Sequence, residues 1–470
     1  MGFDLASTIS NNAHRQGELH GAHVNPQFAR VLRTIGFDKT YVRATGPYLW
    51  DDRGNQYLDF LGGYAVCNFG RNHPTIKKAL SDYLALDLPT MVQFEAPLLS
   101  GLLAEELKRR VGRGLDYVFF TNSGAEGVEA AIKFAKCATG RPALLYAPKA
   151  FHGLSSGAVS LNGCPSFRDG FAPFLPECRM VAFDDLAALE RALAAGDVAA
   201  FVIEPIQGKG VNLHSPGYLE AAARLCHRHG TLFVVDEVQT GIGRTGSFLA
   251  IDQEGSVEPD MVILSKALSG GYVPVGAVLV KSDVWKKVFS SLDRAIVHSS
   301  TFHQGAMAMT AGLAALAAYD EIDAAARARE MGALLKNGLE AMKPRFEMLK
   351  QIRQRGLMIG IEFGAPKSLL LRASWTATHA LDKNLFAQAV VIPLMEDHRV
   401  ICQVAGHELD VVKLIPPLVI NESDVRWFLT AFEDVMTKLH RASSAVNLLA
   451  RLGRNTMFGS QRGSDEVASK

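Results

Sequence analysis

The chain has 470 residues, and its 49 Lys and Arg nearly balance its 48 Asp and Glu. A net charge of +1 gives no basic surface of the kind that phosphate backbones require, so we expect no nucleic-acid partner. Hydrophobic residues make up 48% of the chain, which suits two domains, or one large domain with a smaller companion. The six cysteines are widely separated without zinc-binding spacing, which predicts free thiols and no metal site.

The opening residues lack a positive stretch followed by an apolar run, which argues against a secretory signal. No segment reaches the roughly 18 uninterrupted apolar residues of a membrane span. We therefore expect a cytoplasmic protein without membrane contact. Residues 1–35 are polar and mixed, and they predict an arm or short helix that docks on a larger body.

Residues 48–63 read YLWDDRGNQYLDFLGG, two alternating runs about a polar turn, which predicts a hairpin. We expect residues 1–72, the arm and hairpin, to form part of a small domain. Over residues 73–318, short apolar runs alternate with helical segments, which predicts a large domain with a mostly parallel sheet covered on both faces. The apolar runs are DYVFF, ALLYA, AAFVIEPI, TLFVVDEV, MVILSKA and VGAVLV.

A long helical stretch is expected over residues 306–345, followed by a strand at 355–363 that begins a smaller α+β unit. This C-terminal small domain is expected to span residues 319–440. In the tail, residues 441–470, apolar side chains at helical spacing alternate with arginines and predict a basic amphipathic helix that packs on the body. The last residues of the tail have the composition of a disordered end.

Gly241, Gly243 and Gly246 match the G-x-G-x-x-G spacing of a dinucleotide-binding turn. That fingerprint requires a helix to start at the glycines and an acid about 20 residues later. Here no clear helical face follows, and the acids precede the glycines. We interpret the glycines as a flexible loop after an acid-bearing strand end.

Residues 153–157 read GLSSG, the G-x-S-x-G pattern that raises a nucleophilic serine on a strained turn in α/β-hydrolases. Ser155 would be that nucleophile. The preceding run ALLYA ends several residues earlier, and the following AVSLNG alternates like a strand. The pattern therefore favours a chance match, and a serine hydrolase remains a remote alternative.

A third group of residues lies at the ends of separate predicted strands, and together these residues could form one active site. Asp236 ends the run TLFVV, and Lys266 follows the run MVIL. The segment TNSGAE, residues 121–126, stands between a strand and a helix, where backbone N–H groups can hold a phosphate. Carboxyl ends of parallel strands converge on one edge, so an acid, an amine and a phosphate cradle can share one pocket.

Each of these residues has an ordinary structural role as well. A lysine after a strand is usually solvated, and an acid or serine before a helix is often only an N-cap. The combination favours chemistry, because a lysine beside an apolar strand loses solvation as an ammonium ion. Its pKa then falls, and the free amine can form a Schiff base.

Over residues 40–437 the chain resembles the class III (ω-type) aminotransferases, and it is most similar to their diamine (putrescine-like) branch. The stretches that carry the resemblance include LDFLGGYAVCNFGRNHP, FFTNSGAEGVEAAIKFA, EPIQGKG, DEVQTGIGRTG, SKALSGGYVPVGA, HSSTF and KLIPPLVI. The resemblance implies an enzyme of the pyridoxal-phosphate-dependent transferase fold type I. Its large domain has a mostly parallel seven-stranded sheet between helices, and segments from both termini build the smaller α+β domain.

The resemblance implies that pyridoxal phosphate is the cofactor, with Lys266 as its Schiff-base lysine. Asp236 would hold the pyridinium nitrogen protonated, so that the ring accepts electrons. Gln239 would hydrogen-bond the phenolic oxygen. The other implied cofactor contacts are Phe151 stacked on the ring, His152 beside it, and Glu204, together with Ser123, Gly124 and Ala125 on the phosphate and Thr301 from a second subunit.

Two departures bear on the substrate. Many relatives carry an arginine before PPL that binds the α-carboxylate of glutamate, and a glutamate that neutralises this arginine. This chain has Lys413 and Glu204 at those places, and a lysine lacks the planar fork that grips a carboxylate. Lys209 replaces the usual acid of the EPIQGEGG motif. With Tyr64 and Phe94 expected to line the substrate funnel, we predict a primary amine or aldehyde with an apolar or extended body.

The implied reaction is a ping-pong transfer of an amino group from a primary amine to a keto acid or aldehyde. Freed Lys266 would move a proton as general base and then as general acid. A homodimer is implied because each active site takes residues from two chains. An aminomutase or racemase of the same fold uses the same cofactor residues and remains the alternative.

Overall fold

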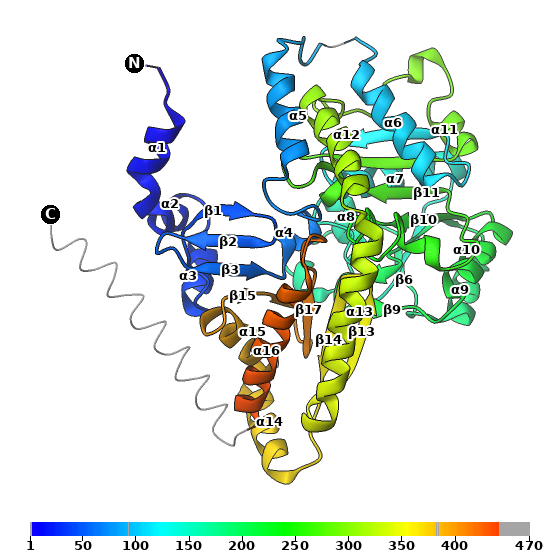
Figure 1. Cartoon of the computed structure of the whole chain (residues 1–470). Coiled ribbons are helices and arrows are strands. Elements are labelled where there is room, and N and C mark those ends of the chain that lie inside the picture. The colour runs from blue at the N-terminus through cyan, green and yellow to red at the C-terminus, as the bar shows by residue number, and fades with distance from the viewer. Residues whose placement is uncertain (1, 93, 382, 384, 441–470) are drawn as a thin grey trace.

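The computed structural model describes residues 2–92, 94–381, 383 and 385–440. Its central sheet has seven strands, in the order β4-β12-β11-β10-β7-β5-β6. Strands β10 and β11, in the middle of this sheet, are labelled in Figure 1. β12 runs antiparallel to both neighbours and the other pairs are parallel, which confirms the predicted sheet. In sheet order the strands are Tyr117–Thr121, Gly276–Val280, Met261–Leu264, Leu232–Asp236, Val198–Ile203, Ala143–Tyr146 and Cys178–Met180.

Helices cover both faces of this sheet because every second side chain of a buried strand points to the opposite face. In β10, for example, Val234 packs in one apolar cluster and Val235 in the other. One face carries α7 (Gly124–Thr139), α8 (Ser156–Ser160) and α11 (Ser282–Val288). The other carries α5 (Pro74–Ala85), α6 (Leu98–Val111), α9 (Leu186–Leu193), α10 (Tyr218–Arg228) and α12 (Ala306–Glu321).

A second sheet joins segments from opposite ends of the sequence. Its order is β1-β2-β3-β15, and β1 to β3 are consecutive antiparallel strands. The expected hairpin is thus β2 and β3, while the short β15 adds parallel to β3 from the C-terminal part. In this order the strands are Tyr41–Thr45, Tyr48–Asp51, Gln56–Asp59 and Val400–Ile401. Before them, where an arm or short helix was expected, lie α1 (Leu5–Asn12), α2 (Gln16–His23) and α3 (Pro26–Thr34).

The C-terminal part holds a third sheet, of order β13-β14-β17-β16. The expected helical stretch is broken after α12, because Asp323 has φ +46° and a new helix begins behind it. Long helices α13 and α16 pack side by side (Figure 1). Strand β13 precedes the strand that was expected to begin this unit. It was not predicted because its sequence, LKQIRQR, is mostly polar. The remaining elements are α13 (Ala324–Met342), β13 (Leu349–Arg355), β14 (Met358–Phe363), α14 (Leu369–Leu381), α15 (Leu385–Glu396), β16 (Gln403–Val404), β17 (Val411–Leu414) and α16 (Glu422–Leu439).

Two small elements frame the carboxyl edge of the central sheet. The turn labelled α4 (Gly62–Ala65) has positive φ at all four residues, so it winds in the left-handed sense. Strands β8 (Ile206–Gln207) and β9 (Asn212–Leu213) form a two-stranded hairpin. No helix within the described residues is long and apolar enough to cross a bilayer. The domain boundaries at residues 72, 318 and 440 stay a prediction, and the tail 441–470 lies outside the described residues.

Candidate active site

A cavity of about 570 Å³ lies at the carboxyl edge of the central sheet. Its walls come from the segments that follow β4, β5, β10 and β11, and parallel strands bring those segments to one edge. Seven residues selected from the sequence line this cavity: Ser123, Gly124, Ala125, Phe151, His152, Asp236 and Lys266. The structure therefore brings the acid, the amine and the helix N-terminus into one site.

Lys266 stands just beyond β11, in a short 3₁₀ turn, with φ +46°. Such a left-handed conformation costs a non-glycine residue on the order of 1 kcal/mol or more, so the surrounding fold imposes it. Burial lowers the pKa of the Lys266 ammonium, and the charges of Asp236 and Glu204 only partly oppose that shift. A lowered pKa leaves a larger fraction of the amine unprotonated near neutral pH, and only the unprotonated amine can act as a nucleophile or a base.

Asp236, the last residue of β10, is held in place by two hydrogen bonds. The Nδ1 atom of His152 lies 2.8 Å from its Oδ2, and the amide of Val238 donates to its Oδ1 over 3.0 Å. Burial acts to lower the pKa of His152, but the bond to Asp236 and the charge of Asp236 outweigh it, so the pKa rises. The His152 Nε2 atom has no hydrogen-bond partner among the described residues.

The N-terminus of α7 forms the opposite wall. Ser123 is the N-cap, and its Oγ accepts a hydrogen bond of 3.2 Å from the amide of Glu126. The first amides of a helix have no acceptor within it, so Gly124 and Ala125 present N–H groups suited to an anion. A Cβ atom on Gly124 would lie 2.9 Å from both Val238 methyl groups, so only glycine fits there. This is a cradle for a phosphate group.

Phe151 and Glu204 connect the cavity to the β8–β9 hairpin. The amide of Phe151 donates to Glu204 Oε2 over 3.1 Å, and the amide of Gly208 donates to Oε1 over 2.8 Å. Burial raises the pKa of the Glu204 carboxyl, which these two hydrogen bonds oppose. Both oxygens of the Glu204 carboxylate therefore accept a hydrogen bond from a backbone amide.

Lys413 is buried in β17. Its Nζ donates to the carbonyl of Gly208 over 2.8 Å and to Gln239 Oε1 over 3.2 Å. Burial lowers the pKa of Lys413 to about 7, and the charges of Lys209 and Lys266 add to the shift. Gln239 also donates to the carbonyl of Tyr64 over 3.4 Å, so this amide is oriented from both ends.

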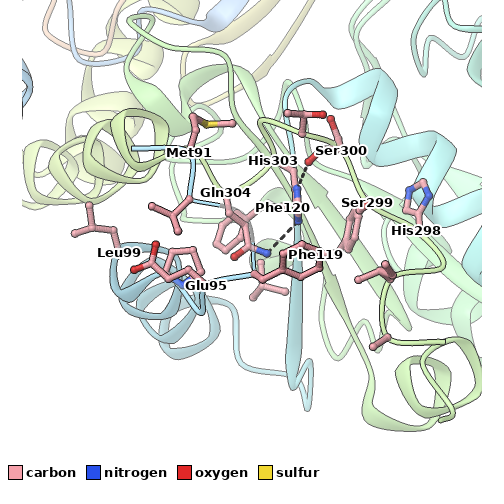
Figure 2. Close-up of a pocket in the computed structure, with 18 of the residues that line it drawn as sticks. Met91, Glu95, Leu99, Phe119, Phe120, His298, Ser299, Ser300, His303 and Gln304 are labelled. Atoms are coloured by element: carbon pink, nitrogen blue, oxygen red, sulfur yellow. Dashed lines mark hydrogen bonds between the residues drawn. The ribbon is translucent and has the colours of Figure 1, made fainter. Parts of the chain in front are cut away.

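Six residues selected from the sequence are not among those that line this cavity: Glu204, Gln239 and Lys413, described above, and also Thr301, Phe94 and Tyr64. Thr301 and Phe94 line a larger neighbouring cavity of about 1130 Å³, while the Tyr64 side chain is 57% exposed. Figure 2 shows that larger cavity, with His303 and Gln304 hydrogen-bonded beside Phe119 and Phe120. The side-chain Nδ2 of Asn122, which lines the smaller cavity, donates to Ser300 Oγ of the larger one over 2.9 Å. The two cavities are therefore neighbours.

The two competing motifs have structural explanations. Ser155 is the N-cap of α8, so the expected strand AVSLNG is wrong: the backbone turns into a short helix there. Ser155 has an ordinary φ of −69°, and its Oγ has no hydrogen-bond partner among the described residues, so no base activates it. The loop of Gly241, expected to be flexible, is buried. Arg244 within it donates to the carbonyls of Leu357 and Pro416 and to the Asn68 side chain, which fixes the loop.

Sequence reasoning missed several residues that line the smaller cavity. These residues lie within or next to the sequence motifs discussed above, and this proximity was the only sign in the sequence that they belong to the site. Tyr272 is the most notable, because its buried hydroxyl has no hydrogen-bond partner among the described residues. The other missed lining residues include Val66, Asn122, Val238 and Ser269.

The family model described as "Aminotransferase class-III" matches residues 35–436. The chain belongs to the class-III aminotransferases. One related protein is aminotransferase PigE of a Serratia species, which is 34% identical to this chain over 93% of its residues. The chain spans only 55% of the length of PigE. Putrescine aminotransferase of Pectobacterium atrosepticum is 35% identical over 89% of this chain and 87% of its own length.

Solved structures agree with this assignment. Ornithine aminotransferase of Toxoplasma gondii superposes with a TM-score of 0.75 at 30% identity, over 85% of this chain and 90% of that one. The cofactor of a class-III aminotransferase is pyridoxal phosphate. The cavity fits this group, because it offers a lysine amine, a buried carboxylate, an aromatic ring and a helix N-terminus within one space.

Proposed function

We propose that the cavity around Lys266 transfers an amino group from a primary amine donor to a keto-acid or aldehyde acceptor. The observation that carries the proposal is the shared cavity of Lys266, Asp236 and the α7 N-terminus. Bound pyridoxal phosphate supplies an electron sink for the carbon that carries the amine. Lys266 would hold this cofactor covalently, and Asp236 would keep its ring nitrogen protonated.

The protein's own residues divide the remaining work. With a donor amine bound, the free amine of Lys266 would take a proton from the donor carbon as a base and then deliver it as an acid. His152 orients the Asp236 carboxylate, and Gln239, held by Lys413, would face the phenolic oxygen. Ser123, Gly124 and Ala125 would bind the phosphate, and Phe151 would stack on the ring. A second half-reaction then returns the amino group to the acceptor.

The donor that we propose is a terminal primary amine with an apolar or extended body. Lys413 supports this proposal because its amine is buried and donates to Gly208 and Gln239, which leaves no arginine fork for an α-carboxylate. The putrescine aminotransferase relative also supports it by its name. Tyr64 and Phe94 would line the path of the donor, in keeping with their exposure in the single chain.

We further propose a cytoplasmic homodimer in which Thr301 of each chain completes the phosphate site of the other. Support comes from exposed apolar side chains that border the larger cavity and its neighbouring loops, among them Phe94, Leu98, Leu292, Ile296 and Phe302. Burying them against a second copy would remove a large apolar surface from water. The unpaired thiols of all six cysteines suit a reducing compartment.

The deciding experiment follows the visible absorption of the purified, cofactor-loaded protein while a panel of amines is added. Productive donors should convert the lysine-bound cofactor to its aminated form, and a keto acid or aldehyde should restore it. Borohydride reduction should attach the cofactor to the peptide that contains Lys266, and Lys266→Ala should abolish this label. Turnover of an amine without any acceptor would instead indicate a racemase or aminomutase and contradict the proposal.

A further inference from the structure

Lys209 lies in the turn between β8 and β9, with its amine between two aromatic rings. Its Nζ is 5.1 Å from the centroid of Phe151 and 4.7 Å from that of Phe167. These two rings meet edge to face, and His407 meets Phe167 in the same way. A Cβ atom on Gly406 would lie 3.4 Å from Lys209 Cδ, so the lysine stem packs against the chain beyond β16. The amine is therefore positioned by packing on several sides.

The Lys209 ammonium has no counter-ion in the described part of the chain. Among the described residues, no carboxylate lies within 4.0 Å of Lys209 Nζ, and no oxygen accepts a hydrogen bond from this atom. Cation–π contacts with the two rings replace only part of the hydration that a half-buried ammonium loses. Burial accordingly lowers the pKa of Lys209, and the smaller effects of Cys164 and Glu204 oppose this shift only in part. An anionic ligand at this amine would supply the missing partner.

The position of Lys209 relates it directly to the reacting centre. Phe151 lines the same cavity as Lys266, so the Lys209 amine stands one aromatic ring away from that cavity. Its charge also contributes to lowering the pKa of both Lys266 and Lys413, after the larger effect of burial. A negative charge brought to Lys209 would be felt at the catalytic amine.

Lys413 is the other cation to consider for an anionic substrate, and its hydrogen bonds make it the poorer choice. Its amine already donates to the Gly208 carbonyl and to Gln239 Oε1 inside the protein. Moving it to a substrate would take this donor away from the Gly208 carbonyl and from Gln239 Oε1, which is unfavourable for groups removed from water. Lys209 incurs no such penalty, because it makes no hydrogen bond that a carboxylate would have to replace.

We propose that Lys209 binds the carboxylate of an acidic carbonyl acceptor, a 2-oxo acid, beside the ring of Phe151. This inference rests on the proposed aminotransferase function and names the residue that selects its acceptor. The donor half-reaction involves a primary amine without a carboxylate, so it does not use Lys209. The acceptor half-reaction does.

The test compares Lys209→Met with Lys209→Arg and with Lys149→Met, a change at a nearby exposed lysine. Each cofactor-loaded protein is first aminated by a diamine, and its reaction with 2-oxoglutarate, pyruvate and butanal is then followed separately. Lys209→Met should lose about tenfold or more in kcat/KM for both acids and less than about threefold for butanal. Lys209→Arg should keep most of the activity with acids, because it retains the charge.

A binding measurement without turnover gives a second readout. Calorimetric titration of the cofactor-loaded protein with glutarate should show about tenfold weaker binding for Lys209→Met than for the wild type and Lys149→Met. Equal losses with acids and butanal, unchanged activity with acids, or a wild type that prefers butanal to both acids would each overturn the inference. If no amine aminates the wild type, the proposed function itself fails, which is a distinguishable result.

Discussion

The Nδ1 atom of His152 lies 2.8 Å from the Oδ2 atom of Asp236, and both side chains are buried at the floor of the candidate site. We expect His152→Leu to leave this carboxylate without its side-chain partner. A hydrogen bond to a charged group is worth about 1.5–3 kcal/mol, so affinity for pyridoxal phosphate should fall about tenfold or more. Equilibrium dialysis against the cofactor measures this change. His152→Asn can place an amide nitrogen near the Nδ1 position and should lose less; equal losses in both variants would contradict a hydrogen-bonding role.

The close approach of Gly124 to Val238 gives a second prediction. In Gly124→Ala the new Cβ would meet both Val238 methyl groups at 2.9 Å, so the N-terminus of α7 must shift. Cofactor affinity should fall, because the amides that face the phosphate move with the helix. Val238→Ala removes the opposing methyl groups and should recover much of the affinity in the double variant. A double variant no better than Gly124→Ala would show that contact with Val238 is not the cause.

Lys413 should make the stability of the protein depend on pH. Its pKa is about 7 in the folded chain, against the ordinary lysine value of 10.5 that applies once the chain is unfolded. Between these values the unfolded state binds more protons, so the free energy of unfolding should rise with pH across this window. The slope should exceed that of Lys413→Met by up to about 1.4 kcal/mol per pH unit. Chemical denaturation across this range measures both slopes, and parallel slopes would argue against a neutral buried amine.

The apolar side chains beside the larger cavity test the proposed dimer. Leu292 and Ile296 are 97% and 74% exposed in the single chain. Changing both to glutamate should shift the protein toward monomer in sedimentation velocity and weaken cofactor binding, because Thr301 of a second chain is then lost from the site. Leu369→Glu alters an equally exposed leucine in α14, 85% exposed, and should leave the dimer intact. Dimers that persist at micromolar dilution in the double variant would contradict this interface.

Much of the fold could be predicted because its signals are local. Buried strands such as β7 and β10 are continuous apolar runs, and such runs alternating with helices imply a parallel sheet. Convergence of the strand ends then places Asp236 and Lys266 at one edge of that sheet. By contrast, β6 has only three residues and was not among the apolar runs, and β13 is polar, so neither showed a clear apolar pattern.

Other features could not be predicted because they depend on contacts between distant segments. The helix break at Asp323 and the left-handed turn that ends at Ala65 require positive φ at residues other than glycine. The place of Lys209 between two rings, and the hydrogen bonds of Lys413, arise only when the β8–β9 hairpin meets the C-terminal part of the chain. The spacing of residues along the sequence does not indicate contacts between segments that are far apart in it.

The hydrogen bonds of Arg244 restrict how parts of the protein can move apart. It sits eight residues after Asp236, and its guanidinium joins Asn68 from the N-terminal part to the carbonyls of Leu357 and Pro416 from the C-terminal part. Three regions of the chain are therefore joined through one buried guanidinium. Separating these regions would leave the buried guanidinium without three acceptors, so movement of peripheral loops is the less costly way to admit a bulky molecule.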